Sequence, residues 1–155
     1  MRPPDRKIAF EIGPDPIRDV LERVGMGQVS GTGFPGEQGG VLPSHRSWSR
    51  IETATFSFGY GLSTTALQLA QAYSVIADDG FRKPVSLLKL DDASVQALHR
   101  EQVIDKTISH QVLAMLESVV DPERGGSARD ARVPFYKVAG KTGTVHVVGE
   151  YGYEE

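Results

Sequence analysis

The segment "YKVAGKTGTVHVV", residues 136 to 148, sets a lysine and two threonines among glycines within an otherwise apolar run. Its valine, tyrosine and threonine content favours a strand, which Gly140 and Gly143 interrupt. Isolated Lys and Thr residues on a strand usually belong to a solvated face, because short motifs often arise by chance. The three residues alone therefore do not show whether Lys141 and Thr142 have a catalytic or binding role, and the surrounding sequence is needed.

The overall composition is that of an ordinary globular domain: 155 residues, of which 39% are hydrophobic and 24% charged. A net charge of −3 without a basic cluster argues against a nucleic-acid partner. Cysteine is absent, and the four histidines have no ligand-like spacing, so we expect no metal and no cofactor. We see neither a membrane-spanning apolar run nor a signal peptide, which predicts a soluble chain.

The clearest secondary-structure signal is a helix between residues 65 and 80. Thr65 and Gln68 form a capping-box pattern, and Gly80 supplies the stop. The apolar residues at helical spacing predict which face is buried. That face comprises Ala66, Leu69, Ala70, Tyr73, Ile76 and Ala77.

Four further segments can be assigned from periodicity and turn residues. Asp15 as the cap and Pro16 at the first helical position predict a helix that ends at Gly25. Residues 26 to 61, rich in glycine, proline and serine, predict a long irregular connection, and residues 83 to 90 predict a strand. Residues 105 to 121 predict a helix. The core-facing residues of that helix would be Ile108, Val112, Met115, Leu116, Val119 and Val120.

Two nucleotide-binding patterns occur in the chain, and both lack their structural context. "GTGFPG", residues 31 to 36, matches G-x-G-x-x-G, but the glycines and proline that follow prevent the helix that would hold a pyrophosphate. "GKT", residues 140 to 142, has Phe135 where a P-loop needs glycine, and strand-like residues follow it. We therefore reject nucleotide binding.

A third pattern resembles a known family. Lys141-Thr142-Gly143 is similar to the K-T-G motif of penicillin-binding proteins and serine β-lactamases. The blocks "FGYGLSTTALQLAQAYSVIADDG" and "GGSARDARV" precede it in the order found in class B penicillin-binding proteins, the peptidoglycan transpeptidases. "VSLLKLD" and "VHVVGEYGYEE" look most like the division-specific branch. The resemblance covers nearly the whole chain from about Lys7 onward.

The resemblance implies a fold of the α/β class, of the α+β type, with helices packed on an antiparallel sheet. It also implies that a strand beside a cleft grips a peptide ending in D-Ala-D-Ala. Lys141 would supply positive charge for the carboxylate and for proton transfer, and Thr142 would hydrogen-bond the carboxylate. Gly143 would admit the substrate backbone, and the N–H of Thr144 would be an oxyanion donor. His146 would border the cleft.

The other two motifs of the family are not found. The only S-x-x-K, Ser86 to Lys89, falls in the predicted strand, where its two side chains would face apart, and S-x-N requires an asparagine that the sequence lacks. We therefore interpret residues 1–155 as a partial transpeptidase domain with an incomplete sheet and an atypical start at residues 1–6. We expect the chain alone to be inactive, and its isolated strand to aggregate or to pair with another chain.

Two alternatives remain open at this stage: a serine β-lactamase or D,D-carboxypeptidase relative, and a non-catalytic interaction module of the same fold. By resemblance, the parent protein would be anchored in the bacterial inner membrane with this region in the periplasm. Its partners would be peptidoglycan stem peptides, β-lactam antibiotics and, through the full-length parent, divisome membrane proteins.

Overall fold

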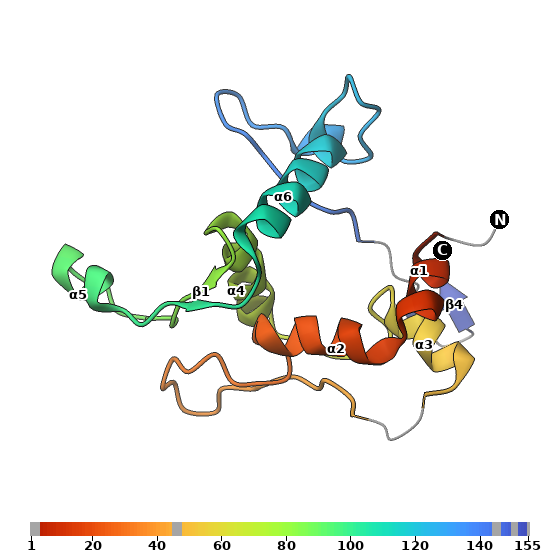
Figure 1. Cartoon of the computed structure of the whole chain (residues 1–155), viewed down its shortest axis with the longest axis horizontal. Coiled ribbons are helices and arrows are strands. Elements are labelled where there is room, and N and C mark those ends of the chain that lie inside the picture. Colours follow the sequence, from red (N-terminus) through yellow and green to blue (C-terminus); the bar gives the residue numbers. More distant parts are fainter. Residues whose placement is uncertain (1–3, 45–47, 144–146, 150–151, 155) are drawn as a thin grey trace. The chain divides into compact units, whose positions relative to one another are not determined.

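The computed structural model describes residues 4–44, 48–143, 147–149 and 152–154. Figure 1 shows a helix-rich chain with short strands, which pair antiparallel. The chain divides into two compact units. Unit 1 comprises Met1–Ser109 and unit 2 comprises His110–Glu155. The mixture of helices with small antiparallel sheets confirms the predicted α+β class.

Unit 1 begins with α1 (Pro4–Ile12) and α2 (Pro14–Arg23). The N-cap of α2 is Gly13, no side chain caps this end, and Pro14 is the first helical residue. The predictions that Asp15 caps the helix and that Pro16 starts it were therefore wrong. Asp15 instead lies in the first turn, where an acidic side chain complements the helix dipole. The predicted end of the helix is confirmed, because Gly25 follows the C-cap with a φ of 99°, a conformation that favours glycine.

The segment predicted as an irregular connection contains a helix, α3 (Arg50–Phe56). Ser49 accepts a hydrogen bond from the backbone N–H of Glu52, whose side chain accepts one from the backbone N–H of Ser49, so a capping box starts the helix. Phe56 is 2% exposed and packs on Trp48 with ring centroids 4.9 Å apart. Residues 31 to 36 form the expected loop, without a helix after them.

Helix α4 (Ala66–Ala77) confirms the strongest prediction, including the capping box between Thr65 and Gln68 and the stop at Gly80. A Cβ at Gly80 would lie 2.0 Å from the carbonyl oxygen of Ile104, so only glycine fits there. The predicted buried face was wrong, because the buried residues of α4 are Gln68, Ala72 and Val75. Helix α4 is apolar on more than one side, and its neighbours select the side that is buried.

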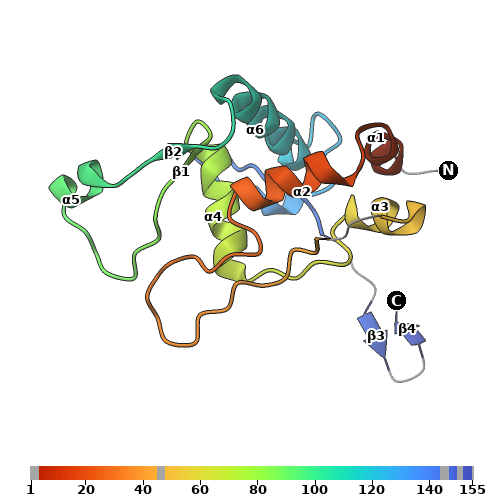
Figure 2. The ribbon, with the colours of Figure 1, turned by 60° about the horizontal axis from the view of Figure 1, so that its bottom comes forward.

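The core of unit 1 forms where the end of α2, the middle of α4 and the residues after β2 meet. These buried apolar residues are Val24, Met26, Ala72, Val75 and Val103. Strand β1 (Phe81–Arg82) pairs antiparallel with β2 (Glu101–Gln102). Figures 1 and 2 show that the chain between these strands projects as an arm that carries α5 (Asp92–Ala97).

The strand predicted at residues 83 to 90 was wrong, because this part of the arm is irregular and pairs with no other strand among the described residues. Pro84 lacks the N–H that a ladder requires, and the Ser86 hydroxyl instead bonds the backbone of Leu88, donating to its carbonyl at 2.8 Å and accepting from its N–H at 3.1 Å. Ser86 and Lys89 are both exposed. The predicted surface position of both residues is therefore confirmed, and the interpretation of S-x-x-K as a coincidence stays a prediction.

Helix α6 (Lys106–Val120) matches the predicted third helix. Asp105 caps it by accepting hydrogen bonds from the backbone N–H groups of Thr107 at 2.8 Å and Ile108 at 3.2 Å. The bonds from Ile108 and then Thr107 hold the pKa of the Asp105 carboxyl below its usual value of 3.8. Two residues of the predicted core face are exposed instead, Ile108 by 53% and Met115 by 65%.

The predicted strand over residues 136 to 148 was only partly right. Residues 137 to 143 have no strand pairing, and the described strand is β3 (Val147–Gly149). Its partner is β4 (Gly152–Glu154), in an antiparallel hairpin that pairs Val148 with Tyr153. Val147 and Val148 therefore have strand partners in β4, whereas residues 137 to 143 have none among the described residues, and aggregation or pairing with another chain stays a prediction.

Candidate functional site

The C-terminal turns of α6 form the platform of the candidate site in unit 2. Carbonyl groups at the end of a helix have no partner within the helix and must bond elsewhere. The carbonyl of Asp121 accepts from the N–H of Gly126 at 2.9 Å, and that of Val119 accepts from the N–H of Ala128 at 2.9 Å. These two bonds fix the backbone on both sides of Ser127.

Gly126 permits this close approach of the loop to the helix. A Cβ at this position would lie 2.3 Å from the carbonyl oxygen of Val119 and 2.8 Å from that of Asp121. Both are backbone atoms that cannot move aside, so any larger residue would lift the loop away from α6. The glycine pair in "GGS" therefore determines where the Ser127 hydroxyl lies.

The segment that carries the K-T-G pattern is fastened to the same helix. The N–H of Gly140 donates to the carbonyl of Leu116 at 3.1 Å, one turn before the carbonyl that holds Ala128. Two segments that are separated in sequence therefore lie side by side on α6. Their arrangement brings Ser127 next to Thr142.

Three polar groups meet at Thr142. The ammonium group of Lys141 donates to the carbonyl oxygen of Thr142 at 2.9 Å and to its hydroxyl at 3.3 Å. The hydroxyls of Ser127 and Thr142 lie 3.4 Å apart. A cation and two hydroxyls thus form one cluster on irregular backbone, and all of these groups can donate hydrogen bonds to an anion.

The cluster is open to a ligand. Lys141 is exposed and makes no ion pair within the described residues, Thr142 is half-buried, and Gly143 is exposed. A Cβ at Gly143 would meet nothing within 4 Å. An unpaired charge beside a hydroxyl and an unobstructed backbone suits a carboxylate that approaches along the chain. Among the described residues, no group of three or more acidic, histidine or cysteine side chains is placed to hold a metal ion.

The structure tests the predicted site residues unevenly. It brings Lys141 and Thr142 together and leaves Gly143 accessible beside them. Thr144 and His146 lie outside the described residues, so the oxyanion donor and the cleft-lining histidine remain predictions. Sequence reasoning assigned no role to Ser127, although the two glycines before it pointed to a loop held close to other backbone.

The family model for the penicillin binding protein transpeptidase domain matches residues 6–155. This chain therefore belongs to the penicillin-binding protein transpeptidase family. A probable peptidoglycan D,D-transpeptidase, PbpC of Pseudomonas aeruginosa, is 46% identical over 149 residues, which cover 96% of this chain and 25% of PbpC. The peptidoglycan D,D-transpeptidase FtsI of Escherichia coli K12 is 39% identical over 146 residues, covering 94% of this chain and 24% of FtsI.

Solved structures agree with this membership. The apo transpeptidase domain of Burkholderia pseudomallei penicillin-binding protein 3 has a TM-score of 0.84 and 41% identity, over 97% of this chain and 44% of that one. Penicillin-binding protein 3 of Mycobacterium tuberculosis, complexed with ampicillin, has a TM-score of 0.78 and 32% identity, over 97% of this chain and 36% of that one. These structures confirm the predicted transpeptidase fold.

The chain spans about a quarter of the length of the curated relatives described above. It also spans less than half of the solved chains. Among the described residues, no helix has the length and hydropathy needed to cross a bilayer.

Proposed function

We propose that this chain is part of a serine-type peptidoglycan D,D-transpeptidase and supplies the wall that grips the donor peptide. The observation that carries the proposal is the meeting of Lys141, Thr142 and Ser127 on an open surface in a chain of this family. The relatives named D,D-transpeptidase support the reaction class. The nucleophilic serine and its lysine base would come from polypeptide outside these 155 residues.

The proposed reaction assigns a separate role to each group. Lys141 and Thr142 hold the terminal carboxylate of D-Ala-D-Ala, while Gly143 lets the peptide backbone lie close. The serine oxygen attacks the preceding carbonyl, the carbon–nitrogen bond breaks, and the serine proton leaves with the terminal D-alanine as its amine. The N–H of Thr144 stabilises the oxyanion, and an amine of a second stem peptide then takes the acyl group.

The finer assignments belong to the same proposal. β-Lactams would acylate the same serine, with their carboxylate on Lys141 and Thr142; the complexes of the Mycobacterium relative with ampicillin and aztreonam support this. His146 would border the bound ligand. The parent protein would act at the division septum, on the periplasmic face of the inner membrane, with divisome membrane proteins. The likeness to FtsI supports this placement.

A graft separates the role of this chain from that of the missing nucleophile. Residues 6–155 would replace the matched segment in the Burkholderia pseudomallei transpeptidase domain, and the product would be incubated with a fluorescent penicillin and analysed by denaturing electrophoresis. We expect a covalently labelled band from the graft and none from this chain alone, because the chain lacks the attacking serine. A labelled band from the isolated chain would contradict the proposal.

The same graft distinguishes the alternatives. A β-lactamase or carboxypeptidase relative would release the label rapidly by deacylation, whereas a transpeptidase would keep it. A folded graft that takes up no label would favour the non-catalytic interaction module.

In the graft, we expect Ser127→Ala to slow acylation about fivefold, because the loss of one neutral hydrogen bond that orients Thr142 costs about 1 kcal/mol. Ser127→Thr should restore most of the rate, since it retains the hydroxyl. The measurement is the rate of fluorescent labelling against penicillin concentration. Equal rates for the alanine variant and the unmodified graft would show that Ser127 does not position Thr142.

A further inference from the structure

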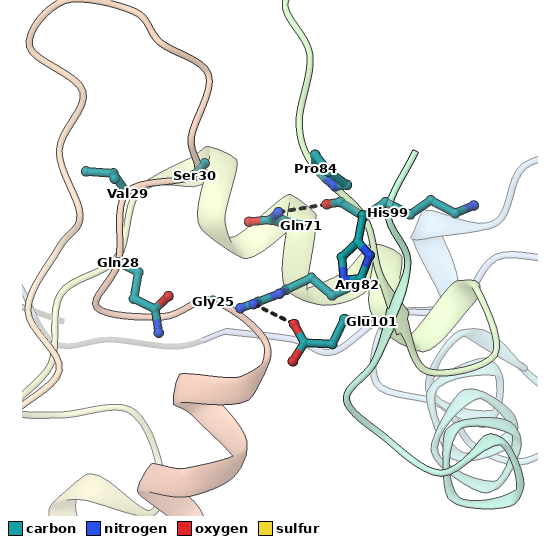
Figure 3. Close-up of a pocket in the computed structure, with 10 residues that line it drawn as sticks. Gly25, Gln28, Val29, Ser30, Gln71, Arg82, Pro84, His99 and Glu101 are labelled. Atoms are coloured by element: carbon teal, nitrogen blue, oxygen red, sulfur yellow. Dashed lines mark hydrogen bonds and ion pairs between the residues drawn. The ribbon is translucent and has the colours of Figure 1, made fainter. Parts of the chain in front are cut away.

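A pocket of about 200 Å³ lies wholly within unit 1. Figure 3 shows that its walls come from the loop after α2, from α4, from β1 and from the residues around the start of β2. The polar side chains relevant to binding are those of Gln28, Ser30, Gln71, Arg82, His99 and Glu101. Lys141 to Gly143 belong to unit 2. A binding experiment on this pocket can therefore fail without contradicting the proposed transpeptidase role.

Basic groups outnumber acidic ones in the pocket wall. Arg82, Lys83 and His99 line it, whereas Glu101 is the one carboxylate among the lining residues. Lys83 already pairs with Asp78 at 2.9 Å. Arg82 is also paired, with Glu101, but its guanidinium has more N–H donors than that ion pair uses, so Arg82 is the cation with capacity left for a ligand.

Arg82 retains hydrogen-bonding capacity. Its Nη2 donates to a side-chain oxygen of Glu101 at 2.8 Å. Among the described residues, the guanidinium makes no other hydrogen bond. A guanidinium has five N–H donors in a planar fork that suits a carboxylate. The side chains of Arg82 and Glu101 are 27% and 53% exposed, so Glu101 can turn outward while Arg82 stays in the wall.

Gly25 keeps the space above the guanidinium open. A Cβ there would lie 3.2 Å from the side-chain oxygen of Gln71 and 4.0 Å from Nη1 of Arg82. The Gln71 side-chain nitrogen is occupied by the carbonyl of Lys83 at 3.0 Å, which leaves its oxygen as an acceptor beside the gap. The hydroxyl of Ser30, also in the wall, is buried and lacks a hydrogen-bond partner within the described chain.

We infer that this pocket binds a carboxylate that carries an adjacent amide N–H, as in an N-acylated amino acid. Arg82 binds the carboxylate, the Gln71 oxygen accepts from the amide N–H, and the Ser30 hydroxyl bonds a second polar atom of the ligand. Glu101 competes with the ligand for the guanidinium. The same chemistry occurs at the C-terminus of a peptide and in a free N-acyl amino acid.

The inference is tested by amide chemical-shift titration of the full chain with N-acetylglycine. The neutral N-acetylglycinamide is the control ligand. A short peptide, with a free or an amidated C-terminus, is titrated in parallel. Tighter binding of the free-ended peptide than of N-acetylglycine would identify a peptide C-terminus as the ligand, and the reverse order a free N-acyl amino acid. We expect saturable shifts at Gly25, Ser30 and Arg82 with N-acetylglycine and none with the amide. Equal shifts with both ligands would overturn the inference, because they would show that charge is not recognised.

Two substitutions should act in opposite directions. Arg82→Gln should weaken N-acetylglycine binding at least about tenfold, whereas Glu101→Gln should tighten it about threefold by freeing the guanidinium. Arg100→Gln makes the same charge change outside the lining residues, where Arg100 pairs with Asp78 at 3.2 Å, and should leave binding within about twofold. The inference would be refuted if Glu101→Gln bound N-acetylglycine more weakly than the unmodified chain, or if Arg82→Gln bound it equally well. Because Glu101→Gln predicts a gain, misfolding cannot imitate the expected result.

Discussion

Lys141→Ala in the graft is expected to slow acylation by fluorescent penicillin about a hundredfold. Lys141 is exposed, pairs with no carboxylate among the described residues, and donates to the Thr142 hydroxyl at 3.3 Å. Removing it takes away a charge-assisted hydrogen bond to the ligand carboxylate and the group that aids proton transfer, which together correspond to about 3 kcal/mol of barrier. Labelling rates at increasing penicillin concentration measure the loss.

Lys137→Ala is the matched control, because Lys137 is an exposed lysine on the same irregular segment, four residues earlier. We expect its labelling rate to stay within about twofold of the unmodified graft, since a distant surface charge contributes little. Similar losses in both variants would indicate a general effect of charge or folding. A Lys141→Ala graft that labels at the unmodified rate would remove Lys141 from the proposed site.

The largest expected effect on stability comes from Gln68→Ala, which should lower the free energy of unfolding of unit 1 by about 3 to 4 kcal/mol. The Gln68 side chain is fully buried, and its nitrogen donates to the carbonyls of Gln28 and Gly39, both at 2.7 Å. Its oxygen accepts from the N–H of Thr65 at 2.8 Å. Truncation leaves buried backbone groups unpaired and opens a cavity.

Gln71→Ala provides the comparison one turn along the same helix. Gln71 is half-buried, and its side-chain nitrogen makes one bond, to the carbonyl of Lys83 at 3.0 Å. Its loss should cost about 1 kcal/mol. Urea unfolding followed through the fluorescence of Trp48, the single tryptophan of the chain, measures both variants. If Gln68→Ala costs no more than Gln71→Ala, the buried amide does not hold the loop to α4.

The buried faces of α4 and α6 show why periodicity predicted helices but not their packing. Leu69 and Tyr73 on the predicted face of α4 are 46% and 39% exposed, and Met115 on α6 is 65% exposed. The chain covers 44% of the Burkholderia transpeptidase domain that it resembles, so we propose that these side chains contact parts of a complete domain that lie outside this chain. A face is buried only when a partner covers it, and periodicity does not identify the partner.

Local rules also failed where short elements depended on distant pairing. Strand β1 is two residues long, and its partner β2 lies about twenty residues away, so no run of alternating residues marks either one. The run at residues 83 to 90 had the composition of a strand but has no partner among the described residues. Strand pairing is a property of two segments, whereas propensity belongs to one.

The sequence alone was sufficient to predict the family and the helices that carry their own caps and stops, and it singled out Lys141 and Thr142 as candidate site residues. Capping boxes, glycine stops and short motifs act over three or four residues, so their physics can be read along the chain. Tertiary structure decided which face of α4 is buried and placed Ser127 beside Thr142, fifteen residues away. Carbonyl groups at the end of α6 bind the backbone next to Ser127 and the backbone of Gly140. No local sequence pattern predicts which distant N–H groups those carbonyls accept from.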